Sequence, residues 1–314
     1  MASHQHAHHH HAHGAGDRGG RGLRVALAIT LLVCATEVGG GIVSGSLALL
    51  ADAGHMFADA GSIGLALWAA SMASRPATGR RTFGFKRAEI LAALANGIVL
   101  GVIAVGIAAA AIGRLSSQPH VDGGLTLVVA AIGFGLNLTS TSVLSRSGGG
   151  LNVRAALRHV AADALSQAGV MLAAVIILTT GWKLADPLAG LLIAVLVLAS
   201  AVGIVRESVD VLMEAAPLGI DVERLGTMMC AVEGVVEVHD LHVWTVTSGF
   251  PAMAAHVTVR GDTEPSMVRR ELAALVRESF GIDHSTLQVE RTGQESDLLQ
   301  LERHLPRRRL EPHE

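Results

Sequence analysis

The sequence predicts a membrane protein in which an all-α bundle of six transmembrane helices precedes a small α+β domain. Half of its 314 residues are hydrophobic, and the mean hydropathy is +0.47. Apolar residues continue for about 20 positions at a time, the length that an α-helix needs to cross the hydrocarbon core of a bilayer. After Arg206 these stretches give way to short segments of alternating polarity. The first part is therefore expected to lie in the lipid bilayer and the second part in water.

The loops between the apolar segments predict how they are oriented. Arg and Lys are concentrated before the first span and after the second and fourth spans, whereas the opposite loops carry almost none. By the positive-inside rule, both termini lie in the cytoplasm of a multi-pass protein, which we expect in the plasma membrane. The predicted spans are residues 24–45, 47–73, 86–113, 123–145, 156–181 and 186–206.

The segment after the spans predicts the element order αββαβ. An amphipathic pattern favours a short helix over 222–232, and Pro265 suits the first turn of a second helix over 264–280. Alternating residues predict the strands 235–245 and 252–259, joined by a turn at 248–251, and a last strand at 285–289. This order is typical of an α+β domain with its helices on one face of a sheet.

The two ends of the chain differ in composition from the rest. Residues 1–22 hold seven of the 16 histidines among Gly and Arg, which is typical of a disordered arm. Such an arm could collect metal ions, or it could be an expression tag, although Ala and Gln interrupt the histidines. We therefore predict a His-rich cytoplasmic arm (1–22), a transmembrane domain (23–208), a cytoplasmic metal-binding domain (209–291) and a polar tail (292–314).

Two pairs of ionisable residues lie within the apolar segments: His55 with Asp59, and His159 with Asp163. Each pair is spaced i, i+4, so both of its side chains share one face of a helix. One such pair could simply hold helices together, but ionisable groups inside a membrane usually mark an ion or proton pathway. Two imidazoles and two carboxylates would form the four-ligand tetrahedral site that zinc prefers. The two pairs therefore predict transport of a metal ion.

Further polar residues lie near these pairs. Asp52 precedes His55 by three positions on nearly the same helix face, so it could support a ligand or line the pathway. Glu37 in the first span could line an outer cavity. The predicted limits put His159 nearer the cytoplasmic edge than His55, so we expect the fifth helix to begin a turn or two earlier, near Leu151.

The ligand types also predict coupling to protons. Zinc requires deprotonated ligands, so its binding releases protons. The pKa of an unperturbed histidine is about 6.5, close to the pH of cytoplasm. Neutral His55 and His159 would capture zinc on the cytoplasmic side and take up protons on a more acidic outer side. The proton gradient would then drive export.

Several stretches resemble the cation diffusion facilitator family, in particular its zinc transporters with His-x-x-x-Asp on spans two and five. The similarity extends over residues 23–291. Its most specific parts are SGSLALLADAGH (44–55), FGFKRAE (83–89), LNVRAAL (151–157), DPLAG (186–190) and HDLHVW (239–244). The resemblance implies a homodimer, a ferredoxin-like cytoplasmic domain, exchange of zinc for protons, and a transport site at the two His-x-x-x-Asp pairs.

The resemblance also implies a second zinc site in the cytoplasmic domain, because relatives bind zinc at the dimer interface there. The matching positions here are His239, His256, His284 and Glu290, with His242 as an additional candidate. Each histidine alone could equally be a surface or strand-packing residue. We expect a regulatory zinc ion at this site. Residues 75–87, where some relatives bind another metal ion, contain no His, Asp or Cys.

The sequence thus predicts proton-coupled efflux of zinc by alternating access, with cadmium or cobalt as further substrates. Two alternatives remain open: a metal-gated divalent cation channel, and a membrane metal sensor that transports nothing. We do not expect an enzyme, since no pairing of nucleophile and base and no phosphate-binding glycine loop is visible. The expected partners are divalent metal ions, protons, the lipid bilayer and a second copy of the chain, but no nucleic acid.

Overall fold

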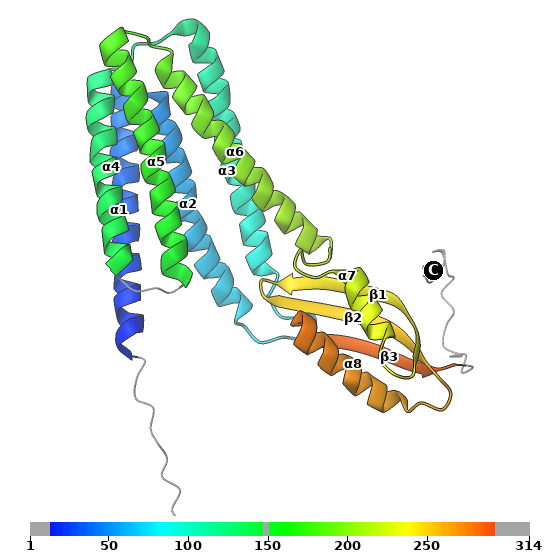
Figure 1. Ribbon diagram of the computed structural model, residues 1–314. Coiled ribbons are helices and arrows are strands. Elements are labelled where there is room, and N and C mark those ends of the chain that lie inside the picture. The colour runs from blue at the N-terminus through cyan, green and yellow to red at the C-terminus, as the bar shows by residue number, and fades with distance from the viewer. Residues whose placement is uncertain (1–12, 147–150, 293–314) are drawn as a thin grey trace, which may run out of the picture. The chain divides into compact units, whose positions relative to one another are not determined.

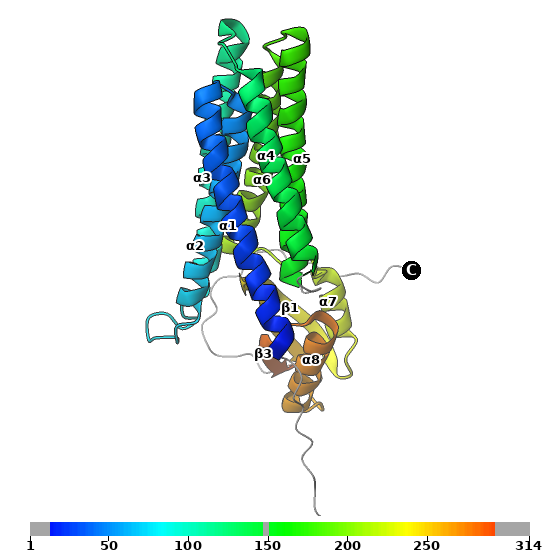
Figure 2. The same cartoon turned by 90° about the vertical axis from the view of Figure 1, so that its left-hand side faces the viewer.

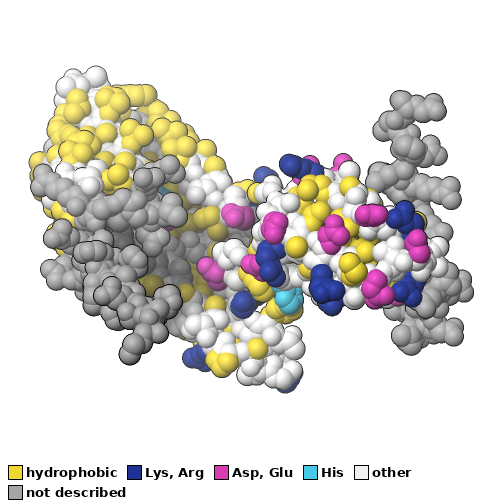
Figure 3. Space-filling view, turned by 60° about the horizontal axis from the view of Figure 1, so that its bottom comes forward, with side chains coloured by type: hydrophobic (Ala, Val, Ile, Leu, Met, Phe, Trp, Pro, Cys, Tyr) yellow, Lys and Arg dark blue, Asp and Glu magenta, His cyan; other side chains and the backbone are white. Residues whose placement is uncertain are grey.

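The computed structural model describes residues 13–146 and 151–292. It divides into two compact units, Met1–Asp210 and Val211–Glu314. Hydrophobic side chains dominate the visible face of the first unit in the space-filling view, whereas Lys, Arg, Asp and Glu gather on the second unit (Figure 3). This contrast matches the change of character that the sequence shows after Arg206.

The first unit consists of long helices that run lengthwise beside one another (Figures 1 and 2). They are α1 (His13–Ser44), α2 (Leu47–Ala73), α3 (Ala88–Ser117), α4 (Gly123–Arg146), α5 (Leu151–Thr180) and α6 (Ala185–Leu212). Within the described residues, six helices are long and apolar enough to cross a membrane, which confirms the six predicted spans.

Several helix boundaries differ from the predicted limits of the spans, and the start of α5 matches the expected earlier start. Helix α5 begins at Leu151, as the depth of its His-x-x-x-Asp pair led us to expect. Helix α6 continues to Leu212, six residues beyond the predicted limit, because its last turns are polar but still helical. Helix α1 begins at His13, inside the segment that we expected to be a disordered arm. The remainder of that arm (1–12) and most of the predicted polar tail (293–314) lie outside the described residues.

Small residues allow the helices of the first unit to approach closely, as is common in membrane bundles. A Cβ atom at Gly97 of α3 would lie 2.9 Å from the Val205 side chain of α6. A Cβ atom at Gly133 of α4 would lie 2.7 Å from Nε2 of Gln167 on α5 and 3.2 Å from Oε1 of Glu37 on α1. Helix α4 therefore contacts polar groups of two neighbouring helices at the centre of the bundle.

A buried carboxylate joins the start of α6 to the start of α2. Asp186 is 1% exposed and accepts hydrogen bonds from the Ser46 hydroxyl and from the backbone N–H of Leu47 (2.7 Å). Arg114, near the end of α3, donates to the carbonyl oxygen of Gly45 and lies 3.9 Å from Asp186. The first N–H groups of a helix have no partner within it, so Asp186 satisfies groups that burial would otherwise leave unpaired.

The second unit has the predicted order αββαβ: α7 (Val222–Cys230), β1 (Val235–Thr247), β2 (Phe250–Val259), α8 (Pro265–Phe280) and β3 (His284–Arg291). The sheet order is β1-β2-β3, with β1 antiparallel and β3 parallel to β2. The turn is shorter than predicted, because Gly249 adopts a φ of +71° and lets Thr247 pair with Phe250.

Both helices of the second unit cover one face of the sheet (Figure 1). Leu225 and Met229 of α7 and Leu272 of α8 are fully buried, and they join Met253 and Val257 of β2 in one hydrophobic core. Residues of β2 that alternate with these, such as His256, point to the opposite face of the sheet. That open face carries the predicted cytoplasmic ligands.

Candidate metal sites

The first candidate site begins on α2, where the helical spacing predicted that His55 and Asp59 share a face. The Nε2 atom of His55 lies 3.4 Å from Oδ2 of Asp59. The two side chains are 25% and 18% exposed, so neither is completely enclosed by the other helices. An imidazole nitrogen and a carboxylate oxygen in contact are two of the ligand types that zinc uses.

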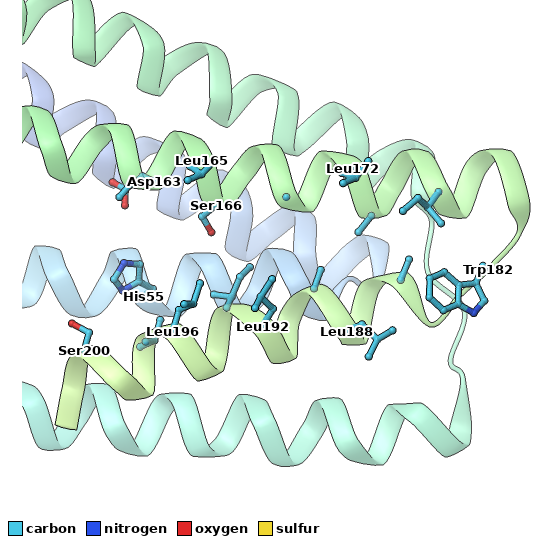
Figure 4. Close-up of a pocket in the computed structure, with 18 residues that line it drawn as sticks. His55, Asp163, Leu165, Ser166, Leu172, Trp182, Leu188, Leu192, Leu196 and Ser200 are labelled. Atoms are coloured by element: carbon cyan, nitrogen blue, oxygen red, sulfur yellow. The ribbon is translucent and has the colours of Figure 1, made fainter. Parts of the chain in front are cut away.

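Helix α5 supplies the other half of this site. Asp163 is 1% exposed, and it lines the same cavity as His55, near one end (Figure 4). His159 belongs to the preceding turn of α5, but its side chain lies outside the described residues. The structure thus places two predicted ligands, His55 and Asp163, on different helices around one space, with Asp59 in contact with His55.

The cavity has a volume of about 730 Å³ and extends from His55 toward Trp182 (Figure 4). Apart from His55, its lining comes from α5, α6 and the connection between them, and most of its side chains are apolar, such as Leu188, Leu192 and Leu196. Apolar walls offer an ion no alternative ligands, so the polar groups at the His55 end determine where a cation can stay.

Asp52 lies behind this cavity and does not line it. The side chain is fully buried, and its Oδ1 atom accepts a hydrogen bond of 2.6 Å from the hydroxyl of Ser166, which does line the cavity. Asp52 is therefore connected to the cavity through one hydroxyl group. Sequence reasoning missed Ser166 and Gln167, although their spacing of three and four from Asp163 places them on the same face of α5.

Glu37 is not at the lining of an outer cavity, as we expected it could be. It is fully buried, and its Oε1 atom accepts a hydrogen bond of 2.7 Å from Gln167. Gln167 in turn accepts one of 3.1 Å from Asn137 of α4. An amide donor in the neighbouring helix fixes Glu37 inside the bundle, and the sequence of α1 alone gives no sign of this.

The second candidate site lies on the open face of the sheet in the second unit. His239 of β1 pairs with His256 of β2, and the centroids of their rings are 5.4 Å apart. Asp240 joins them, so that one potential ligand atom from each of the three residues lies within 4.8 Å of the others. Asp240 has a φ of +50° in a bulge between His239 and His242, which the alternating pattern of the strand did not reveal.

The other predicted ligands of this site are more distant along the strands. His284 pairs with Ala252, and its ring contacts that of Phe250 at a centroid distance of 5.8 Å. Glu290 pairs with Thr258, two positions beyond His256. Within one protomer the structure therefore brings together His239 and His256 but does not add His284 to them.

Comparisons with known proteins agree with both halves of this architecture. A model of the cation efflux transmembrane domain matches residues 23–213, and a model of the cation efflux protein cytoplasmic domain matches residues 217–292. The chain is 35% identical to a solved structure described as the metal-bound C-terminal domain of the CzcD transporter from Cuprividus metallidurans. That match covers 23% of this chain and 99% of that one, with a TM-score of 0.22.

Similar full-length relatives come from several bacteria. The zinc transporter ZitB of Escherichia coli is 39% identical over 87% of this chain and 88% of its own length. A cadmium, cobalt and zinc/H(+)-K(+) antiporter of Bacillus subtilis is 39% identical over 81% and 83%. The metal cation efflux system protein CzcD of Cupriavidus metallidurans is 38% identical over 86% of each chain. The chain therefore belongs to the cation efflux family, the cation diffusion facilitators, and is a membrane transporter and not an enzyme.

Proposed function

We propose that this protein exports zinc in exchange for protons, and that His55, Asp59, His159 and Asp163 bind the ion during transport. The observation that carries this proposal is the cavity that His55 and Asp163 line from two different helices, with Asp59 in contact with His55. The relatives named for zinc transport and for antiport with H(+) support both the cargo and the exchange.

The ligand set favours zinc and leaves room for similar ions. Imidazole and carboxylate suit a tetrahedral zinc ion, but ligand softness does not separate zinc sharply from cobalt or cadmium. Relatives named for cadmium, cobalt and zinc support this broader range. Cadmium and cobalt are therefore proposed as secondary substrates.

The coupling follows from the protonation that these ligands require. A zinc ion displaces protons from its ligands when it binds, and protons compete with it when they return. If the site opens alternately to the two sides of the membrane, a proton gradient directed into the cell expels the metal. The distribution of Arg and Lys in the loops supports a plasma-membrane protein with both termini in the cytoplasm.

We further propose that the cytoplasmic domain binds a regulatory zinc ion through His239, Asp240 and His256. Three ligands leave one position of a tetrahedral ion unfilled, and a second copy of the chain could supply it. By register, His284 and Glu290 share the open face of the sheet with His256, so they are available to a neighbouring protomer. A homodimer that contacts through this face would be sensitive to cytoplasmic metal.

Zinc flux into proteoliposomes tests the transport site. We expect His55→Ala and Asp163→Ala each to abolish flux, while Ser200→Ala, which changes a cavity residue with a weaker ligand, retains it. Full flux in either ligand variant would contradict the assignment. Zinc flux that does not depend on an imposed pH gradient would favour a metal-gated channel. Zinc binding without any flux would favour a membrane metal sensor that transports nothing.

A further inference from the structure

A chain of hydrogen-bonded polar side chains crosses the centre of the bundle beside the transport site. It runs from Asn137 of α4 through Gln167 of α5 to Glu37 of α1, while Ser166 of α5 donates to Asp52 of α2. Apart from Ser166, all of these side chains are completely buried. The side chains come from four helices, so their contacts are a property of the folded bundle.

Each carboxyl group of this cluster has one oxygen atom with a donor and one without. Oε1 of Glu37 and Oδ1 of Asp52 accept the hydrogen bonds described above, whereas Oε2 of Glu37 and Oδ2 of Asp52 are buried with no donor among the described residues. The two carboxyl groups face each other within hydrogen-bonding reach. Two carboxyl groups can form a hydrogen bond only when a proton lies between them, because neither ionised group has a donor.

The surroundings do not offset two negative charges. The titratable groups near the pair are Asp163 of α5, whose negative charge opposes a second negative charge on either acid, and His55 of α2, which offsets such a charge only when its imidazole carries a proton. Cys34 is a neighbouring thiol on α1, and α4 contributes the amide of Asn137. Buried like charges in contact are relieved when the pair keeps one proton.

We propose that Glu37 and Asp52 together hold one proton, and that this carboxyl pair is a proton-binding site of the exchange, separate from the residues that bind the metal. The proposal rests on the proposed function. When a divalent cation reaches His55 and Asp163, its positive charge offsets the second negative charge that the pair gains on losing its proton.

Ser166 connects the carboxyl pair to the cavity, so the proton can be transferred through its hydroxyl group to water. Its hydroxyl group contacts Asp52 and also lines the cavity that contains His55 and Asp163. The Ser166 hydroxyl group, which donates to Asp52 in the structure, first rotates so that it donates to water in the cavity. Its oxygen then accepts the proton from Asp52 while its own proton passes to that water. The carboxyl pair then carries two negative charges, and the cavity water carries the released proton. Return of a proton reverses both transfers when the metal has left.

The variant Glu37→Gln tests this assignment in the full-length protein. A glutamine keeps the acceptor for Gln167 and offers a permanent donor to Asp52, so it resembles the protonated pair and cannot release the proton. Calorimetric titration with zinc in buffers of different protonation enthalpy counts the protons released for each zinc ion bound. We expect Glu37→Gln to bind zinc and to release fewer protons than the wild type, by up to about one.

Asp186→Asn is the matched control, because Asp186 is equally buried but already has donors from Ser46 and Leu47. It should release as many protons for each bound zinc ion as the wild type. An unchanged proton count in Glu37→Gln would overturn the proposal. Suppose that Asp163→Ala abolishes zinc binding while Glu37→Gln still releases the wild-type number of protons. This result would support the proposed metal ligands and contradict the separate proton-binding site.

If Glu37→Gln does not fold, infrared difference spectroscopy on the wild type can test whether a buried carboxyl group loses its proton when zinc binds. A protonated carboxyl group gives a C=O stretching band that shifts in D2O. We expect zinc to remove such a band from the spectrum of the wild type, and Asp186→Asn to leave this change intact. A zinc-bound wild type that loses no such band would overturn the proposal without any variant at Glu37.

Discussion

Ser166 connects the buried acid Asp52 to the cavity, and its hydroxyl group is the donor to Oδ1 of Asp52. In Ser166→Ala the Oδ1 atom of Asp52 would lose its donor, and a buried polar group without a partner costs about 1–3 kcal/mol. We therefore expect a lower free energy of unfolding by about that amount, measured by thermal denaturation in detergent. Ser200→Ala serves as the control, and equal stability of the two variants would argue against this contact.

The proposed histidine ligands would make zinc affinity depend on pH, because a protonated imidazole cannot bind the metal. Zinc affinity should therefore rise as the pH is raised from about 5 to about 8. Equilibrium zinc binding in detergent across this range measures the slope. In His55→Gln the remaining affinity should rise less steeply. A wild-type affinity that stays constant across the range would show that no histidine binds the transported ion.

At the scale of single residues, the sequence predicted a contact within one helix and missed contacts between different helices and strands. The i, i+4 spacing was enough to predict the contact between His55 and Asp59, because both lie on one helix. The burial of Glu37 could not be predicted, since it depends on Gln167 from a helix 130 positions away in the chain. Asp240 joined the cytoplasmic cluster through a bulge that an alternating pattern does not show.

At the scale of elements, Asp186 joins the start of α6 to the start of α2. In Asp186→Ala, the Ser46 hydroxyl and the Leu47 N–H would lose a charged acceptor, so we expect a loss of more than about 2 kcal/mol in unfolding free energy. Asp122→Ala is the control, because Asp122 caps α4 through one exposed hydrogen bond to Leu125, a type that is typically worth about 1 kcal/mol. If both variants unfold at the same temperature, Asp186 does not hold these helices together.

The lengths of the elements were largely predictable, because apolar stretches of membrane length leave few alternatives to a helix. The depth of His159 predicted the early start of α5, which begins at Leu151. The polar ends were less predictable. Helices α1 and α6 continue beyond their apolar parts, and composition does not mark where a helix leaves the membrane. In the second unit, the turn at Gly249 shifted the inner ends of the first two strands, and β3 (His284–Arg291) is longer than the expected strand 285–289.

At the scale of the whole molecule, the protein has two candidate metal sites, for which we propose different tasks. In the double variant His239→Ala/His256→Ala, the cytoplasmic site loses two ligands while the transmembrane site is unchanged. We expect the full-length variant to bind fewer zinc ions than the wild type, by up to about one per protomer, and still to transport zinc. Equilibrium dialysis counts the ions and vesicle flux measures transport. An unchanged zinc count would contradict the cytoplasmic site.

The whole molecule also has to couple two flows in opposite directions. The proposed transport ligands lie beside the buried acids Glu37 and Asp52. In our proposal, metal and proton therefore occupy neighbouring parts of one bundle and exclude each other through their charges. A channel built from the same helices would need neither the exchange of protons at its ligands nor their return.

The most direct test records zinc uptake and proton movement together in proteoliposomes that contain the wild-type protein, with a pH gradient imposed and then collapsed. We predict that zinc moves against the direction of proton flow, that each flux stops when the other ion is withheld, and that collapse of the gradient ends zinc accumulation. Zinc that continues to accumulate without a gradient, or that moves without any counterflow of protons, would contradict the exchange.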